Sequence, residues 1–172
     1  AAHSSGSAAS GGSVDATEVL AATDTLDRLL DELLGDGRAV LAPVAVPPLL
    51  SPEVCALAAG PQAHERLVES GLPLRAVGAW RALSDPVREV LSRGVTLSTE
   101  QCAAIAALYD VANAIAFLVE RDQLDALAAD MEQRRWTELL DLSVGEIDAL
   151  FTLLGDDRLA RRPRLYLLGA LA

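Results

Sequence analysis

The sequence predicts an all-α fold, a multi-helix bundle of seven to nine helices. Of its 172 residues, 31 are Ala and 31 are Leu, and these two residue types have high helix propensity. Apolar residues recur at intervals of three and four in several segments, which is the period of one helical face. The chain has 6 aromatic residues and 3 Ile, whereas strands are enriched in aromatic and β-branched residues. An all-β sandwich or barrel is therefore disfavoured.

The length predicts one domain. Residues 1–13 consist of Ser, Gly and Ala with one His and no charge, a composition typical of a flexible tag or linker. The helical domain is therefore predicted to span residues 14–172. No run of about 18 apolar residues occurs in the sequence, so a transmembrane span is not predicted.

The first predicted helix begins after Val14 and ends at Gly35, with Leu26, Leu30 and Leu33 on its apolar face. The next segment, Ala39–Leu50, is apolar and contains three prolines. Because proline removes a backbone donor and restricts the residue before it, this segment cannot be helical throughout. We expect an extended connector that packs across the bundle.

Short helical units are predicted between Ser51 and Gly94. Each is bounded by an N-capping residue or a proline at its start, or by a glycine at its end. The predicted units are Ser51–Gly60, Pro61–Gly71, Leu74–Leu83 and Asp85–Gly94.

A long central helix is predicted to begin near Thr99. Ser98 and Gln101 have the spacing of a capping box, and the residues after them are apolar on almost every side, which is typical of a helix covered by others. We expect this helix to reach at least Glu120, with a break near Arg121. A second capping box, Ser143 with Glu146, predicts a later helix that ends at Gly155.

The charge and the residue types disfavour several classes of function. The net charge is −11, and all 14 basic residues are Arg, so the protein is acidic and lacks the basic surface of a nucleic-acid binder. Apart from His3 in the tail, His64 is the sole histidine. The sequence has no metal-ligand spacing, no G-x-S-x-G elbow and no phosphate-binding glycine motif. We therefore predict no catalytic residue, no metal and no cofactor, and we do not expect an enzyme.

The two cysteines, Cys55 and Cys102, lie in apolar helical segments, where a free thiol behaves as a small hydrophobic group. This favours a reducing compartment, the cytoplasm of the cell or the cytosol of another cell to which the protein is delivered.

Six residues are candidates for an interface. Trp80 and Trp136 each neighbour an arginine, and Trp and Arg are enriched in interface hot spots. The C-terminal segment contributes Arg158, Arg161, Arg162 and Arg164. These arginines have two interpretations: they bind an acidic partner or a lipid surface, or they pair with the acidic helices of the protein itself.

Asn113 is polar within the most apolar part of the chain. A buried amide requires hydrogen bonds, so Asn113 is predicted either to fix the packing register or oligomeric state, as a single polar core residue can do, or to contact a ligand in a cavity.

The segment Gly71-Leu-Pro-Leu-Arg75 carries one local resemblance. Its last three residues resemble the arginine-finger loop of bacterial GTPase-activating effector domains, which are also small helical bundles. In that family the glycine lies three residues before the arginine, where this chain has Leu72, and polar residues follow where this chain has Ala76-Val77. The resemblance covers five of 172 residues and implies GTPase activation by Arg75 as a further alternative function.

The function predicted from the residues is a non-catalytic protein–protein interaction or scaffold domain. Its apolar helical faces, either the stripe between Thr99 and Val119 or the C-terminal segment, would bind a protein partner or a second copy, giving an oligomer. The alternative is a helical-bundle binder of a hydrophobic small molecule or lipid, with Asn113 as the polar group in an apolar cavity.

Overall fold

The computed structural model describes the backbone of residues 16–171 and the side chains of residues 21–170. This part of the chain contains twelve α-helices, one 3₁₀-helix and one two-stranded sheet. The prediction of an all-α fold is confirmed only in its broad form, because this part of the chain is mostly helical but also contains a two-stranded sheet. The predicted count of seven to nine helices is wrong, because the helix predicted from Thr99 is two helices and because short helices such as Gly37–Leu41 and Trp136–Leu140 were not predicted. The predicted tag or linker, residues 1–13, lies outside the described residues.

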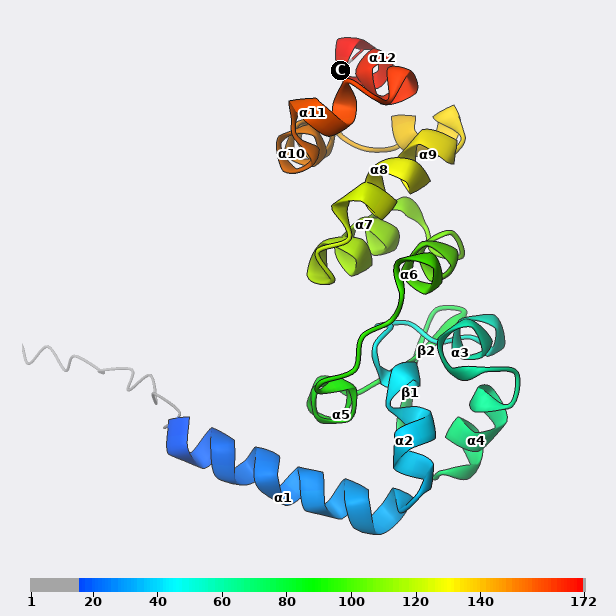
Figure 1. Ribbon diagram of the computed structural model, residues 1–172, viewed down its shortest axis with the longest axis vertical. Helices are drawn as coiled ribbons and strands as arrows, with labels where there is room; N and C mark the ends of the chain where they lie inside the picture. Colours follow the sequence, from blue (N-terminus) through cyan, green and yellow to red (C-terminus); the bar gives the residue numbers. More distant parts are fainter. Residues whose placement is uncertain (1–15, 172) are drawn as a thin grey trace, which may run out of the picture.

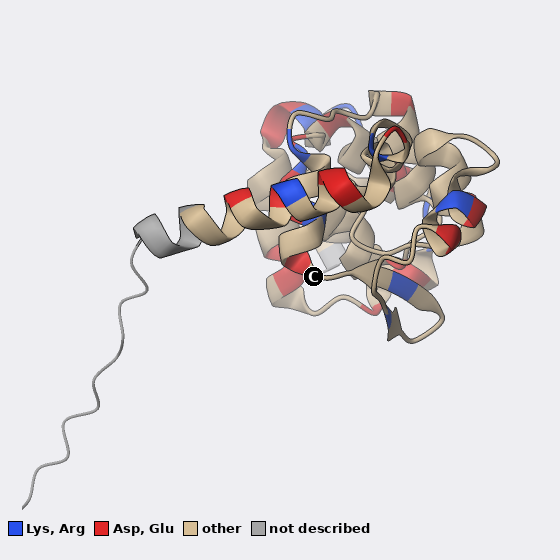
Figure 2. Cartoon of the chain, turned by 90° about the horizontal axis from the view of Figure 1, so that it is seen from below, with Lys and Arg blue, Asp and Glu red and all other residues tan. Residues whose placement is uncertain are grey.

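Helix α1 (Ala16–Leu34) ends where predicted, at Gly35 with φ +48°. It lies across one end of the molecule and extends beyond the other helices at its N-terminal end (Figures 1 and 2). Arg38 of the following helix α2 (Gly37–Leu41) pairs with Asp27 and Asp31 of α1. The hydrogen bond from Arg38 holds the pKa of Asp27 below its usual value. These ion pairs connect α1 to the rest of the protein.

The proline-rich connector, Ala39–Leu50, is less extended than predicted. It begins inside α2, continues as the 3₁₀-helix η1 (Pro43–Ala45), and ends at Leu50, which forms an isolated antiparallel bridge with Arg81. Tight helical turns accommodate proline at their first positions. Val44, Ala45, Val46, Leu49 and Leu50 are buried, so the prediction that this segment packs against the bundle is confirmed.

The predicted helix at Leu74–Leu83 is wrong, because this segment is a β-hairpin. Strand β1 (Leu74–Val77) pairs with strand β2 (Trp80–Leu83), with Leu74 opposite Leu83 and Val77 opposite Trp80. The turn is Gly78-Ala79, and Gly78 has φ +58°, which suits the first central position of a type II′ turn. Leu50 also binds the backbone of Arg81 in β2. Turn chemistry and this tertiary pairing together override helix propensity here.

The other three short helices confirm the prediction for this region, with bounds a few residues inside those expected. They are α3 (Pro52–Ala59), α4 (Ala63–Glu69) and α5 (Asp85–Ser92). The Ser51 hydroxyl accepts a hydrogen bond from the Val54 amide and caps α3 as expected.

The prediction of one long central helix is also wrong, because this segment forms two helices. The capping box of Ser98 and Gln101 opens α6 (Thr99–Ala106), and a turn then separates it from α7 (Val111–Glu120). Asp110 is the N-cap of α7, where its Oδ1 accepts a hydrogen bond from the backbone amide of Asn113 at 2.8 Å. Asp is favoured at an N-cap over the helix interior. The sequence contained this signal, but the surrounding apolar run concealed it.

Five helices complete the chain. They are α8 (Leu124–Gln133), α9 (Trp136–Leu140), α10 (Val144–Leu154), α11 (Asp156–Leu159) and α12 (Pro163–Leu171). The predicted break near Arg121 is confirmed, with Asp122 at φ +54°. The capping box of Ser143 and Glu146 is confirmed at the start of α10.

The helices are arranged along one long axis (Figure 1). Helices α1–α5 and the hairpin lie at one end, α7–α12 lie at the other, and α6 lies between them. One cluster of buried apolar residues runs through both parts. Trp80 of β2 packs edge-on against Tyr109, which packs edge-on against Phe117 of α7. Among the described residues, no helix has the length and apolarity needed to cross a membrane.

Candidate functional site

The described residues contain no cluster of three or more His, Cys, Asp or Glu side chains that could bind a metal ion. Cys55 and Cys102 are both buried free thiols. Burial raises the pKa of Cys55 to about 11 and raises that of Cys102. A thiolate is the nucleophilic form, so neither thiol is activated at neutral pH.

An uncovered apolar groove lies between α7 and α10, which both pack on α8. Each wall presents residues at positions i, i+3, i+4 and i+7, the spacing of a single helix face. The lining residues are Ala112, Ile115, Ala116 and Val119 of α7, Glu146, Ala149, Leu150 and Leu153 of α10, and Leu142 before α10. We call this hollow the apolar end of the α7–α10 groove.

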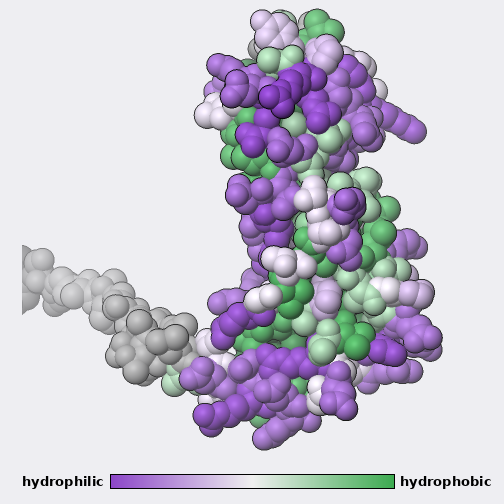
Figure 3. Space-filling view, in the orientation of Figure 1, coloured by the Kyte–Doolittle hydropathy of each residue, from purple (hydrophilic) through white to green (hydrophobic). Residues whose placement is uncertain are grey.

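The apolar end has a volume of about 360 Å³. Val119 and Leu153, one on each wall, are both 37% exposed. In the space-filling view, a small hydrophobic area is visible on the left of the upper half at the level of α10, and a larger one lies in the lower half (Figure 3). Apolar side chains at this spacing usually face a core or a partner. Leu150 is buried, whereas Val119 and Leu153 remain exposed at the hollow.

A second hollow continues the groove. It shares Ala112, Leu142 and Glu146 with the apolar end. Its further lining residues come from the α6–α7 turn, from the end of α8 and from α9: Leu108, Tyr109, Asp110, Arg134, Glu138 and Asp141 among them. Its volume is about 560 Å³. We call it the acidic end of the groove.

Arg134, the one basic residue that lines the acidic end, makes its contacts within the protein. The Arg134 side chain is 8% exposed, and its Nε lies 2.7 Å from Oδ2 of Asp130. The same guanidinium donates to the carbonyl oxygens of Tyr109 and Ala106, each at 3.0 Å. Its Nη1 also lies 3.4 Å from Oε2 of Glu138. The Ala106 carbonyl also accepts from the backbone amide of Tyr109, so Arg134 adds a second donor there and connects the end of α8 to the end of α6.

The acids at this end have mostly neutral partners. Glu146 Oε2 accepts from the amide and the hydroxyl of Ser143, which lowers the pKa of Glu146 and keeps it ionised at neutral pH. Asp110 accepts from the amide and the side chain of Asn113. Asp141 is exposed.

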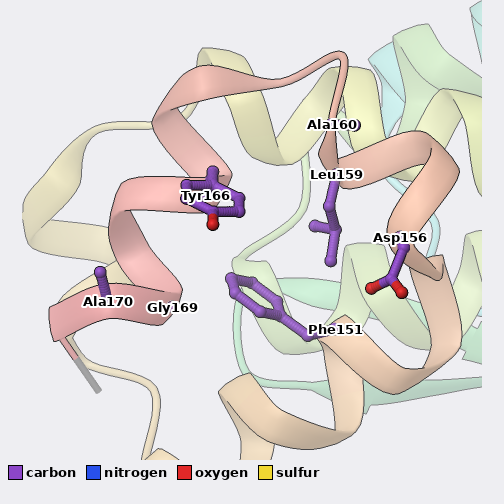
Figure 4. A pocket seen from close by; sticks show the side chains of 7 residues that line it. All are labelled: Phe151, Asp156, Leu159, Ala160, Tyr166, Gly169 and Ala170. Atoms are coloured by element: carbon purple, nitrogen blue, oxygen red, sulfur yellow. The ribbon is translucent and has the colours of Figure 1, made fainter.

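A separate hollow lies between α10, α11 and α12, with a volume of about 560 Å³. Phe151 and Tyr166 project toward one another across it, and Leu159 projects into it (Figure 4). A Cβ placed on Gly169 would lie 2.1 Å from Cε2 of Phe151. The ring of Phe151 therefore packs against the backbone of Gly169, and only glycine permits this approach.

Both predicted interface tryptophans have internal partners. Trp80 is half-buried against Tyr109, with ring centroids 5.3 Å apart. Trp136 is half-buried, and the guanidinium of Arg164 lies 5.2 Å from its ring centroid. Neither lines the α7–α10 groove.

Two of the four C-terminal arginines bind the protein itself. Arg164 donates to the carbonyl oxygens of Glu132 at 2.6 Å and Arg134 at 2.9 Å, and Arg158 Nε lies 2.7 Å from Oδ1 of Asp125. Of the two interpretations of the basic segment, internal pairing describes these two residues. Arg161 and Arg162 lie in the turn between α11 and α12.

Asn113 occupies a different environment from the one expected. It is half-buried in the first turn of α7, and its Nδ2 donates to Oδ2 of Asp110 at 2.7 Å. Its side chain therefore supports a local cap. It does not line either end of the groove.

Arg75 is exposed on strand β1, opposite Ala82 of β2, and it borders a hollow with Pro73, Asp85 and Pro86. The resemblance placed it in a finger loop, whereas the structure places it in a paired strand.

The groove residues on α10 and in the α9–α10 connection were not singled out from the sequence. Their signal was present, because residues 146, 149, 150 and 153 repeat the spacing of residues 112, 115, 116 and 119. Comparisons with protein-family models, curated proteins and solved structures gave no match.

Proposed function

We propose that this protein is a non-catalytic interaction domain that binds a helix of a partner protein in the α7–α10 groove. The observation that carries the proposal is the pair of helix surfaces that line one open hollow, each with the i, i+3, i+4, i+7 spacing and each with exposed apolar side chains. Binding of an apolar helix face in a groove between helices is a recurring mode of peptide recognition.

The dimensions of the apolar end suit a helix. Seven residues of a helix rise about 10 Å, or two turns, which is the length of each wall. Three of the lining residues are alanines, namely Ala112, Ala116 and Ala149. These alanines are exposed, and their short side chains allow a helix backbone to come close, while Ile115, Val119 and Leu153 offer larger apolar contacts.

The charge of the chain favours a different protein over a second copy as the occupant. The exposed amphipathic helix of this chain is α1, where Leu29 and Leu33 are 56% and 58% exposed. However, α1 also carries Asp24, Asp27, Asp31 and Glu32, and the chain has a net charge of −11. Like charges at an interface disfavour association.

A labelled synthetic helix tests this proposal. The probe is a peptide of about 18 residues, held helical by a side-chain lactam, with Leu on one face and Gln on the other. We expect binding to the wild-type protein by fluorescence anisotropy. The double variant Val119→Gln with Leu153→Gln should raise the Kd at least about tenfold, since each buried apolar side chain contributes more than 1 kcal/mol.

Val68→Gln is the matched control, because Val68 is an exposed valine on a helix outside the groove, 59% exposed. It should leave the Kd unchanged. Absence of binding by the peptide, or equal loss in the control and the groove variant, would overturn the proposal.

A second candidate function is binding of a hydrophobic small molecule or lipid. The hollow at Phe151 and Tyr166 supports it (Figure 4), because its volume of about 560 Å³ lies in the range of ligand sites. Fatty acids of several lengths should then raise the Tm of the wild-type protein.

Gly169→Ala, which displaces Phe151, should remove this rise in Tm. Gly145→Ala is its matched control, since a Cβ there meets nothing within 4 Å. No rise in Tm with any fatty acid would count against this second function.

A further inference from the structure

We infer that the α7–α10 groove selects a partner helix whose apolar stripe ends in arginine or lysine, with those basic residues over the acidic end. This inference rests on the proposed function and specifies the chemistry of the partner. Its basis is the unequal distribution of charge along one continuous groove.

The acidic end holds more negative charge than the protein neutralises. Five carboxylates lie in or beside it, with a single guanidinium, that of Arg134, among them: Asp110, Asp130, Glu138, Asp141 and Glu146. Arg134 is nearly buried and engages Asp130 and two backbone carbonyl groups. Its other acidic partner is Glu138, so among the described residues Asp110, Asp141 and Glu146 have no basic partner.

The hydrogen bonds made by these acids leave their charge in place. Asp110 and Glu146 accept from amides and a neutral side chain or hydroxyl. Each sits at a helix N-terminus, which supplies roughly half a positive charge. Two such termini offset about one carboxylate, so the acidic end keeps a net negative charge.

The groove also has a direction. The acidic end lies at the beginning of α7, where Asp110 is the N-cap, and at the beginning of α10, where Glu146 is in the first turn. The apolar end lies further along both helices, toward Val119 and Leu153. A bound helix therefore meets apolar walls over two turns and carboxylates beyond one end of that contact.

Asp141 is the residue best placed to form an ion pair with a partner. It follows the last residue of α9, it is exposed, and it lines the acidic end. Among the described residues its carboxylate has no ion-pair or hydrogen-bond partner. An arginine or lysine of a partner would supply one, with complementary charge increasing both specificity and association rate.

Four lactam-stapled peptides with the same apolar face test the inference. One carries three arginines at its N-terminal end, one carries them at its C-terminal end, and the other two carry Gln or Glu at both ends. We expect one arginine peptide to bind the wild-type protein most tightly and the Glu peptide to bind most weakly. The affinity of that arginine peptide should fall as NaCl rises from about 50 to about 300 mM, while that of the Gln peptide changes little.

Asp141→Asn should weaken binding of the tighter arginine peptide by about fivefold, a modest effect typical of an exposed pair, and leave the Gln peptide unaffected. Asp148→Asn is the matched control, because Asp148 is an exposed acid of α10 outside the groove. Equal affinities for the arginine, Gln and Glu peptides would overturn the inference while leaving the helix-binding groove in place. Failure of all four peptides to bind would overturn the groove itself.

Discussion

Arg134 and Asp130 form an ion pair in which Nε and Oδ2 are 2.7 Å apart and both side chains are less than a tenth exposed. Both residues belong to the C-terminal end of α8, yet the guanidinium also binds the carbonyl oxygens of Ala106 and Tyr109. One side chain therefore connects α8 to the turn that separates α6 from α7.

Replacing Arg134 should be strongly destabilising. Arg134→Met leaves the Asp130 carboxylate nearly buried without its cation and removes one donor from each of two carbonyl groups, so we expect a loss of about 3–5 kcal/mol in the free energy of unfolding. Urea denaturation measures it. In the control, Arg158→Met, the partner Asp125 is 84% exposed, and the loss should stay below about 1 kcal/mol. Similar losses in the two variants would contradict this role for Arg134.

Gln101 joins a helix start to a neighbouring helix end. Its Oε1 accepts from the Ser98 amide, and its Nε2 donates to the carbonyl oxygens of Leu57 and Ala58 at 3.0 and 3.3 Å. Gln101→Glu keeps the capping box but places a carboxylate oxygen against those carbonyls, which should cost about 1–3 kcal/mol. Protonation of the new side chain restores a donor, so part of the loss should recover below about pH 4. A variant as stable as wild type at pH 7 would exclude this contact.

The buried thiol of Cys55 should make the protein less stable in alkali. Burial raises its pKa from 9.0 to about 11, so the folded state disfavours the thiolate. This contribution to stability is complete below about pH 9 and is lost as the pH rises through about 11. Urea midpoints between these values should fall less steeply in Cys55→Ala than in wild type. Some slope should remain, since burial also raises the pKa of Cys102 and Tyr109. Identical slopes would be inconsistent with a buried thiol.

The turn of the hairpin should depend on Gly78. With φ +58° at this position, Gly78→Ala should cost about 1 kcal/mol of stability, because an L-residue is strained there. Gly145→Ala, in the first turn of α10 with open space around it, should be neutral or slightly stabilising. Thermal unfolding of the two variants makes the comparison, and an unstrained Gly78→Ala protein would indicate a different turn.

Local signals predicted most of the helix boundaries. The capping boxes at Ser98 and Ser143 and the glycine after Leu34 each lie at an observed helix end, because they act within one turn of the backbone. The same logic failed at Leu74–Leu83, where the strand β2 is completed by the backbone of Leu50, more than twenty residues earlier. Propensity alone carries no information about that partner.

The groove illustrates a second reason why the sequence predicts only part of the structure. The stripe between Thr99 and Val119 was expected on a single helix face. In the structure, Cys102, Ile105 and Tyr109 enter the core, whereas Ala112, Ala116 and Val119 line the groove. Asp110 starts a new helix between them and redirects the stripe. The opposite wall comes from α10, and its proximity depends on tertiary packing that a linear pattern does not contain.

The position of α8 has a consequence for how this surface can change. Because α7 and α10 both pack on α8, the spacing of the two walls depends on how they pack on α8, whose buried side chains include Ala126 and Leu127. Substitutions that enlarge or shorten those residues would widen or narrow the groove. They would do so without changing any residue that contacts a bound helix. Such substitutions would change the affinity for a partner helix without changing the acidic residues that recognise its charge.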